Sequence, residues 1–486
     1  MIIGVNSLDD GKLEMMHFKF RQLLLLIIGL IGLVVVVIAI PTAVKYVGRA
    51  SGVSANLVVD YAGVLGQLPT PWRNLAQGGE EPKPMLGNVI SEVKNLKPEY
   101  IRLDHIYDAY KVVSKNGGQL SYDWSGLDKA VDEVIATGAK PFLSLSYMPP
   151  AISSGDIIAL PNDWNDWSNV IQATIEHFSG RNNRNMSNVI YEVWNEPDLY
   201  GDWKSWVGVD GVSVNGTKNY LTMYEYAARG AARAANTNTY EFGGPAITAL
   251  YNDWLTRMIN FVDKKNLRMD FFSWHRYATD VTQFENDVNA AREVASRVPA
   301  LVNLKFYITE WGHNSNVDPG YDSAFGAIHT LAASRVMMAK AQRAFVFEIK
   351  DGPGTQKLWG RWGLLTHENF GTPEEKPRYK ALTFLNDLGQ FRISLAGEGS
   401  WIKGIASTDT NGNIRLMVVN YDSASTHSEA VPISFDNLPK GNFKYQRRNF
   451  LGGTMAAVQV ATSAASWKTM EFFGPNSAAM ITLDFQ

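Results

Sequence analysis

Two glutamates carry the clearest chemical potential in this sequence. Glu196 lies in the run Trp194-Asn195-Glu196-Pro197, and Glu310 lies in the run Thr309-Glu310-Trp311. Cleavage of a bond between two sugars needs one carboxyl group that can donate a proton and a second that stays ionised on the other side of the reacting carbon. Two glutamates brought together by a fold meet both needs. A lone glutamate would more often cap a helix or pair with an arginine, so the inference depends on the pair.

Both glutamates follow short apolar runs that we expect to be strands of a parallel sheet. From residue 57 to about 388, eight such runs alternate with amphipathic stretches, which is the pattern of repeated βα units. Eight units close a barrel whose C-terminal strand ends meet at one mouth, so the fourth and seventh runs would bring the two glutamates together. The runs are Leu57 to Tyr61, Tyr100 to Leu103, Pro141 to Ser146, Ile190 to Trp194, Tyr240 to Gly243, Phe271 to Trp274, Phe306 to Thr309 and Ala344 to Phe347.

The fourth run contains a second glutamate that competes with Glu196. Alternation along a strand places Glu192, Trp194 and Glu196 on one side, so the period alone does not choose between the two acids. Pro197 cannot donate to a sheet and marks the end of the strand directly after Glu196. We therefore expect Glu196 at the mouth.

The pattern of apolar and polar residues changes after Leu388. Short alternating runs with turn signals follow, as at Asn411-Gly412, and no helical period is evident. The expected fold is thus α/β: a (β/α)8 TIM barrel over residues 51–388 and a C-terminal β-sandwich over residues 389–486. Strands are expected at Trp401 to Ser407, from Ile414, at Ala430 to Phe435 and at Ala478 to Phe485.

An apolar segment precedes the barrel. Leu23 to Ile40 is a run of eighteen residues without a charge, long enough to cross a bilayer. The weak excess of basic residues before it favours a cytoplasmic N-terminus. We expect a cytoplasmic extension at residues 1–22, a transmembrane helix at residues 23–41 and a single-pass membrane protein with its catalytic domain outside the cytoplasm. The alternative is a signal peptide that is cleaved on secretion.

Composition excludes several classes of partner. The formal net charge is -3, so the chain lacks the excess of basic residues that binds a polyanion, and we expect no nucleic acid partner. The chain has no cysteine and no His-x-x-x-His helix, so we expect neither a metal site nor a cofactor. The many aromatic residues suit large cores or sugar stacking equally well.

The two glutamate motifs resemble clan A of the glycoside hydrolases, and within that clan the similarity is greatest to family 39. Three further segments resemble that family in order along the chain. This resemblance implies a retaining mechanism with Glu196 as acid/base and Glu310 as nucleophile. The three segments are Phe142 to Pro149, Gly243-Gly244-Pro245-Ala246 and Ser273-Trp274-His275-Arg276-Tyr277.

Three departures from the family pattern bear on the substrate. Where family xylosidases and iduronidases show Arg-x-His, this chain has Arg102-Leu103-Asp104. Ser144 stands where those xylosidases carry glutamate, and Arg276 stands where proline is usual. The Arg-x-Asp form resembles members that cut bacterial exopolysaccharide, so we expect an endo-acting polysaccharide hydrolase.

Neighbouring residues have expected roles in substrate binding. Asn195 resembles the clan residue that binds the sugar 2-hydroxyl, and Tyr277 is placed to donate to Glu310, which would favour the ionised carboxylate. His275 could contact either the sugar or a catalytic glutamate. Arg102 would hold a carboxylate charged or pair with Asp104. Tryptophans that follow the last two strands are candidates for sugar stacking, and these are Trp311, Trp359 and Trp362.

Other functions remain open on the same residues. A β-xylosidase-type exo-glycosidase and a transglycosylase would use the same site. A non-catalytic carbohydrate-binding scaffold would have had no need of both glutamates.

Overall fold

The computed structural model describes residues 52–78, 85–203, 218–338, 340–462 and 465–486. Residues Ala55–Gln486 form one compact unit. The predicted extension at 1–22 and the predicted transmembrane helix at 23–41 lie outside the described residues. Within the described ranges, no helix is long and apolar enough to cross a membrane.

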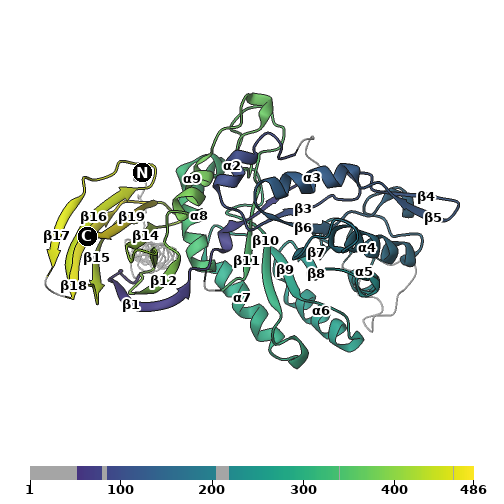
Figure 1. Ribbon diagram of the computed structural model, residues 1–486, viewed down its shortest axis with the longest axis horizontal. Helices are drawn as coiled ribbons and strands as arrows, with labels where there is room; N and C mark the ends of the chain where they lie inside the picture. The colour runs from purple at the N-terminus through teal and green to yellow at the C-terminus, as the bar shows by residue number, and fades with distance from the viewer. Residues whose placement is uncertain (1–51, 79–84, 204–217, 339, 463–464) are drawn as a thin grey trace, which may run out of the picture. The chain divides into compact units, whose positions relative to one another are not determined.

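Eight parallel strands close a barrel, as the alternation of the sequence predicted (Figure 1). Seven of the eight predicted runs match barrel strands, and the two glutamate motifs fall on the fourth and seventh strands around the barrel. The strands are β2 (Asn74–Gln77), β3 (Tyr100–Leu103), β6 (Lys140–Leu145), β7 (Val189–Val193), β8 (Tyr240–Ile247), β9 (Phe271–Tyr277), β10 (Lys305–Gly312) and β11 (Arg343–Phe347).

Helices cover the outside of the barrel because one face of each is apolar. In α4, Trp167, Val170 and Ile171 are fully buried, and the side chain of Asp163 caps the helix by accepting from the Asn165 N–H. The helices are α2 (Ile90–Asn95), α3 (Ser125–Ala136), α4 (Trp164–Ser179), α5 (Tyr220–Arg233), α6 (Asn252–Lys265), α7 (Thr282–Ala295), α8 (Ala324–Met337) and α9 (Pro377–Leu385). Short 3-10 turns are η1 (Pro71–Arg73), η2 (Pro150–Ile152), η3 (Pro299–Leu301), η4 (Pro319–Asp322) and η5 (Glu368–Phe370), and β4 (Val113–Asn116) pairs with β5 (Gln119–Tyr122).

The interior of the barrel is layered. Tyr100, Phe142 and Ile190 belong to a buried aromatic-rich layer. Two residues further along each strand, alternation brings polar side chains into the next layer: Arg102 follows Tyr100, and Glu192 follows Ile190. The apolar layer thus forms the floor on which the polar mouth is built.

The first predicted strand was wrong. Leu57 to Tyr61 was expected in the barrel, but it lies in β1 (Leu57–Gln67), which pairs with strands of the C-terminal domain. Leu57 and Val59 are buried while Val58 and Asp60 are half-buried, so the strand has one apolar face. Strands of a parallel barrel are covered on both faces, as β2 is throughout.

The C-terminal domain is one sheet of nine strands in the order β17-β16-β19-β14-β13-β12-β1-β15-β18. Its ends approach each other, since the rings of Phe443 on β16 and Trp467 on β18 have centroids 5.4 Å apart. The sheet therefore folds over a common core as a half-barrel or sandwich. Its remaining strands are β12 (Phe391–Ala396), β13 (Ile402–Thr408), β14 (Ile414–Asn420), β15 (Glu429–Asp436), β16 (Gly441–Asn449), β17 (Val458–Thr462), β18 (Ser466–Phe473) and β19 (Ser477–Phe485).

The barrel and this sheet share apolar core. Met417, Val419 and Met480 from the sheet are buried in the same cluster as the barrel helices. Arg335 of α8 also forms a two-pronged ion pair with Glu398, at 2.9 Å for each contact. The sheet is thus a structural support of the barrel wall.

Candidate active site

Glu196 is fixed by a tight turn at the end of β7. Trp194 and Glu196 both have positive φ values, 74° and 46°, which side-chain-bearing residues adopt only when surrounding contacts hold them. The Glu196 N–H donates to the Ala246 carbonyl at 2.9 Å, and the Glu196 carbonyl accepts from the Tyr200 N–H at 2.7 Å. The indole of Trp194 donates to the Tyr200 carbonyl at 3.2 Å. The turn lifts Glu196 into the mouth, whereas Glu192 stays fully buried.

Glu310 reaches the mouth through an irregularity in β10. Strict alternation from Tyr307, which belongs to the buried interior layer, would send Glu310 to the outer face. The pairing of β10 with β9 shifts between Ile308 and Glu310, and Glu310 then lies opposite His275. Such a shift re-aims a side chain next to active sites.

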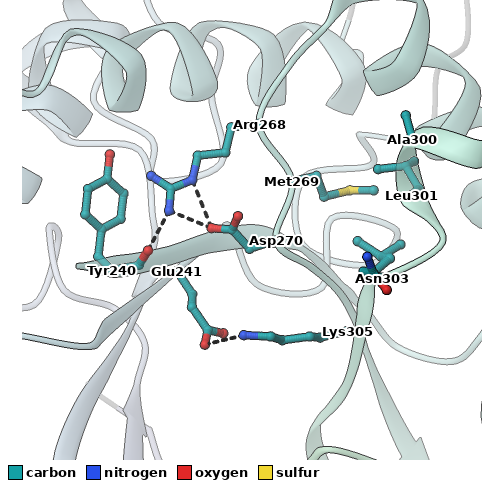
Figure 2. A pocket seen from close by; sticks show the side chains of 10 residues that line it. Tyr240, Glu241, Arg268, Met269, Asp270, Ala300, Leu301, Asn303 and Lys305 are labelled. Carbon is teal, nitrogen blue, oxygen red and sulfur yellow. Dashed lines mark hydrogen bonds and ion pairs between the residues drawn. The ribbon is translucent and has the colours of Figure 1, made fainter.

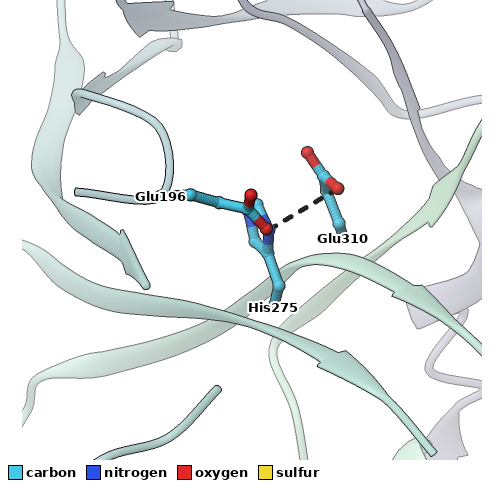
Figure 3. A group of neighbouring side chains, drawn as sticks. All are labelled: Glu196, His275 and Glu310. Atoms are coloured by element: carbon cyan, nitrogen blue, oxygen red, sulfur yellow. Dashed lines mark hydrogen bonds and ion pairs between the residues drawn. The ribbon is translucent and has the colours of Figure 1, made fainter. Parts of the chain in front are cut away.

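The two carboxylates meet at His275 (Figure 3). Nδ1 of His275 lies 2.9 Å from Oε1 of Glu196 and 3.5 Å from Oε2 of Glu310. One oxygen of each carboxylate lies within 4.8 Å of the other. Retaining glycosidases hold their carboxyl groups roughly 5 to 5.5 Å apart, and inverting ones need about 6.5 to 9.5 Å to admit a water. Oxygens this close are consistent with the shorter separation of the retaining class.

Arg102 organises the mouth from below. Its Nε donates to Glu192 at 2.7 Å, its Nη1 to Glu310 at 3.0 Å and its Nη2 to Asn195 at 2.8 Å. Burial lowers the pKa of this guanidinium, but Glu192, Glu310 and Asp104 more than offset that effect and raise it. The arginine is therefore a permanent charge that fixes three acceptors at once.

Glu310 has a raised pKa. Burial raises the pKa of its carboxyl to about 7, against the opposing charges of His275 and Arg102 and with a further upward contribution from the Glu196 charge. Tyr277 donates to Oε2 of Glu310 at 3.0 Å, as predicted from its position. Such a bond favours the ionised carboxylate, but burial of the carboxyl is the larger effect, so the net pKa is raised.

His275 is electrostatically tied to both acids. Burial lowers the pKa of its imidazole, but the charge of Glu310 and the hydrogen bond and charge of Glu196 more than offset burial, so the pKa is raised. The histidine is fully buried. Of the two open alternatives for His275, contact with a catalytic glutamate is the one that the geometry supports.

Asn195 is oriented by two partners. Its Oδ1 accepts from Arg102, and its Nδ2 donates to the Tyr147 hydroxyl at 2.9 Å. The Tyr147 ring packs edge-on against Trp194, with centroids 5.1 Å apart. Sequence reasoning did not single out Tyr147, although it follows the end of β6 in the same way that Asn195 follows β7.

A cleft of about 860 Å³ opens over these residues. Asn195, Glu196, Tyr277 and Glu310 line it, and so does Asp104, which is 6% exposed. His275 and Arg102 lie beneath. Trp362 also lines the cleft.

Two of the predicted stacking residues lie elsewhere. Trp311 is fully buried, and its ring packs edge-on against Phe284 with centroids 5.8 Å apart, so its prediction as a sugar-stacking residue was wrong. Its ring is a core contact below the mouth. Trp359 is half-buried and absent from the described lining of the cleft, and the Arg361 guanidinium lies between it and Trp362, at 5.5 Å and 4.2 Å from their ring centroids.

The spacing of Glu196, His275 and Glu310 could by itself hold a metal ion, since each offers a ligand atom. Two features favour proton chemistry instead. Arg102 and Tyr277 already donate to the two oxygens of Glu310. The raised pKa of His275 favours the imidazolium, which cannot ligate a metal.

A second hollow of about 410 Å³ lies at the opposite ends of β8, β9 and β10 (Figure 2). Its charges are mutually paired: Arg268 contacts Asp270 at 2.8 Å, and Lys305 contacts Glu241 at 2.7 Å. In barrels of this kind the N-terminal strand ends serve stability, so chemistry belongs to the other face.

Comparison with known proteins agrees with this geometry. Residues 85–436 match the profile described as "Glycosyl hydrolases family 39". A protein named "Beta-xylosidase" from Caldicellulosiruptor saccharolyticus is 28% identical over 337 residues, covering 62% of this chain and 64% of that protein. Another "Beta-xylosidase", from Geobacillus stearothermophilus, is 26% identical over 313 residues, covering 57% and 58%. The chain thus matches less than two thirds of the length of either relative.

Among solved structures, a monomeric beta-xylosidase from Caulobacter crescentus CB15 superposes with a TM-score of 0.73, covering 88% of this chain and 99% of that one at 19% identity. The "GH39 enzyme from Xanthomonas axonopodis pv. citri" gives 0.72, covering 89% and 98% at 18% identity. At these identities the superpositions establish the shared fold of barrel and β domain.

Proposed function

Because this chain belongs to glycoside hydrolase family 39, a family of retaining O-glycosidases, we propose that it cleaves glycosidic bonds with Glu310 as nucleophile and Glu196 as acid/base. One observation carries the proposal: two carboxylates lie against one ring nitrogen of His275, with oxygens within 4.8 Å of each other, at the base of a cleft. Both side chains retain access to the cleft, at 15% and 8% exposed.

In the first step, an oxygen of ionised Glu310 attacks the anomeric carbon while Glu196 gives its proton to the leaving oxygen. The bond to the leaving group breaks, and a glycosyl ester on Glu310 forms. In the second step, Glu196 takes a proton from water as the water oxygen attacks the same carbon. The ester bond breaks, and both glutamates return to their starting states.

The neighbours support charge movement in these steps. Arg102 and Tyr277 hold Glu310 in one orientation through both of its oxygens. Asn195 has its carbonyl oxygen occupied by Arg102 and one N–H by the Tyr147 hydroxyl, so its second amide N–H is the group that serves a sugar hydroxyl. We assign it the 2-hydroxyl contact that strengthens in the transition state.

The proposed substrate is an extracellular polysaccharide or an oligosaccharide derived from one. Asp104 lies in the cleft, beside the buried Arg102, in place of the histidine of family xylosidases. Ser144 is fully buried and donates to the Trp194 carbonyl at 2.7 Å, so it offers no contact to a sugar in place of the family glutamate. The alternative, a β-xylosidase-type exo-glycosidase, is favoured by the names of the two relatives described above.

A transglycosylase would use the same intermediate with a sugar in place of water. A non-catalytic scaffold is disfavoured because three side chains contact and orient the glutamates. Arg102 and Tyr277 donate to Glu310, and His275 contacts Glu196.

The test begins with a panel of polysaccharides and 4-nitrophenyl glycosides, with sizing of the products. A hit identifies the sugar, and its 2-deoxy-2-fluoro analogue should then trap the enzyme covalently. Peptide mass mapping is expected to place the label on Glu310. A label on another residue would reject the nucleophile assignment, and an enzyme without any turnover would reject the function.

We further propose that the enzyme is held at the cell membrane by residues 23–41 with its barrel outside the cytoplasm, on the strength of the apolar run in the sequence. Protease added to intact cells should digest the barrel. If the barrel is protected in intact cells and digested after lysis, it lies inside the cytoplasm and the proposed topology is wrong. Release of the protein into the medium would indicate a cleaved signal peptide.

A further inference from the structure

The cleft has two chemically different walls. Side chains from the end of β11 and from the loops after β3, β10 and β11 are mostly polar or charged, as with His105, Asn316 and Arg361. Phe347 and Trp362 are the aromatic members of this side. Apolar and aromatic side chains come from the loops after β6, β7 and β8. We call the second group the apolar wall, and its members are Ile157, Ile158, Leu199, Tyr200 and Tyr251.

The apolar wall exposes more apolar surface than a solvent-facing loop needs. Leu199 is 60% exposed, Tyr200 is 45% exposed and Tyr251 is 41% exposed. Single exposed apolar residues are common, but a cluster that lines one wall of a cleft marks a binding surface. A ligand bound in the cleft would bury this exposed apolar surface.

The two tyrosines of the apolar wall make specific contacts with the protein although they are exposed. The Tyr251 hydroxyl lies 3.1 Å from the Thr248 hydroxyl, and the Thr248 N–H donates to Asp198 at 3.0 Å. Tyr200 is held by the backbone contacts of the Glu196 turn and by the edge of the Tyr147 ring, with centroids 5.8 Å apart. Two exposed aromatic rings are therefore held in place before a ligand arrives, which reduces the entropy lost on binding.

The position of the wall specifies which part of a substrate it meets. Leu199 and Tyr200 follow Glu196 in the same turn, and Asp198 links that turn to Tyr251 through Thr248. A proton donor must lie beside the oxygen of the leaving group. The apolar wall thus lies on the leaving-group side of the scissile bond.

The charges of the wall select the chemistry of the leaving group. Among the described residues of these loops that line the cleft, Asp198 is the charged one besides Glu196, and its carboxylate accepts from the Thr248 N–H and hydroxyl. Arg276, on the neighbouring strand, directs its guanidinium to both oxygens of Asp287 at 2.6 and 2.8 Å. No cation in this part of the described cleft is directed at an acidic sugar.

We propose that Leu199, Tyr200 and Tyr251 form a leaving-group subsite that binds an uncharged sugar through its apolar C–H face. This inference rests on the role of Glu196 as acid/base proposed above. The apolar wall would then determine which leaving groups the enzyme accepts. It would also determine which sugars act as acceptors in transfer, since an acceptor must occupy the same place as the leaving group.

The test compares two probes that share the sugar found by the panel screen. A glycosyl fluoride has no leaving sugar to bind, whereas an oligosaccharide has one. Tyr251→Ala and Leu199→Ala should lower kcat/KM for the second probe by about tenfold each, since burial of such apolar surface contributes on this order. The fluoride should be hydrolysed at the wild-type rate. Tyr251→Phe keeps the ring, so its kcat/KM for the second probe should stay near that of the wild type. Val302→Ala is the matched control, since it removes a 67% exposed apolar side chain remote from the cleft.

Acceptor transfer gives a second measurement. With the fluoride as donor, a neutral methyl glycoside should be a better acceptor than glucuronate at equal concentration, and Tyr251→Ala should lower the ratio of transfer to hydrolysis. Equal losses on both probes, or preference for glucuronate, would overturn the subsite while leaving the proposed function intact. A wild-type enzyme that cleaves no probe would overturn the proposed function itself.

Discussion

Nδ1 of His275 lies 2.9 Å from Oε1 of Glu196. The same nitrogen lies 3.5 Å from Oε2 of Glu310, so a single ring nitrogen faces both carboxylates from the fully buried floor of the cleft. The protonation of Glu310 therefore depends on both neighbours, because the charge of His275 lowers its pKa and the charge of Glu196 raises it. The distribution of protons among these three side chains governs the activity of the enzyme.

The pH dependence follows from the raised pKa of Glu310. Its ordinary value of 4.5 is raised to about 7 in the folded protein, chiefly by burial. The protonated form is favoured below that pH, and a protonated nucleophile cannot attack. We expect kcat/KM for an activated substrate to fall about tenfold per pH unit on the acid side of this value. A flat profile down to pH 5 would contradict the assignment.

Removal of the Glu196 charge should move this acid limb. Glu196 raises the pKa of Glu310 by repulsion between like charges. Glu196→Gln is therefore expected to shift the limb to lower pH, measured with a substrate whose leaving group needs no proton. An unchanged limb would indicate that the two carboxylates are not coupled.

Arg102 should be required for both stability and catalysis. Arg102→Met leaves the buried Glu192 without its ion-pair partner, and breaking a buried pair costs about 3–5 kcal/mol. The substitution also removes a positive charge that lowers the pKa of Glu310, so the acid limb should move to higher pH. Chemical denaturation and the pH profile measure the two effects.

Arg102→Lys is the matched control for charge. Lysine keeps the positive charge but cannot direct three N–H groups to Glu192, Glu310 and Asn195 together. Compared with Arg102→Met, this variant should have its acid limb closer to the wild-type pH, because the charge is kept. Its free energy of unfolding should remain close to that of Arg102→Met. A lysine variant with wild-type behaviour would show that the forked geometry is unimportant.

The C-terminal sheet should be inseparable from the barrel. Deletion of residues 389–486 exposes Leu57 and Val59 of β1 and uncovers the helix surface that packs against Met417 and Met480. Deletion of residues 52–67 in addition removes the first defect and leaves the second. Both truncated proteins should aggregate, as judged by size-exclusion chromatography. A soluble, active barrel would contradict this account.

The alternation of apolar runs with amphipathic stretches was sufficient to predict seven barrel strands, and the two glutamates were found at or just after the ends of two of them. It failed at the first strand because β2 carries polar residues whose partners lie far away in sequence. The Asn74 side-chain carbonyl oxygen accepts from Arg343 at 3.5 Å, and the Gln77 side chain donates to Glu348 and to the Lys350 carbonyl. These tertiary hydrogen bonds make a polar stretch suitable for a barrel interior, and nothing local indicates them.

The candidate site shows the same limit. Pro197 predicts a strand end directly after Glu196, whereas β7 ends earlier, at Val193. Glu196 lies in the turn that follows and still lines the cleft. The shift in β10 that turns Glu310 inward depends on pairing with β9, and the contact of Arg102 with three acceptors depends on closure of the barrel. Trp311 follows Glu310 in sequence but packs on Phe284, since adjacent strand residues face opposite sides.

The distinct roles of Glu196 and Glu310 are the central claim. Azide rescue of the two alanine variants, with assignment of the product anomer, tests it most directly. With a 4-nitrophenyl or fluoride substrate, Glu196→Ala should still form the glycosyl ester on Glu310, and azide should accelerate its breakdown to a glycosyl azide of retained configuration. Glu310→Ala should form no ester, and any azide product should have inverted configuration. The opposite pattern, an inverted azide from Glu196→Ala and a retained one from Glu310→Ala, would contradict the account by exchanging the two roles.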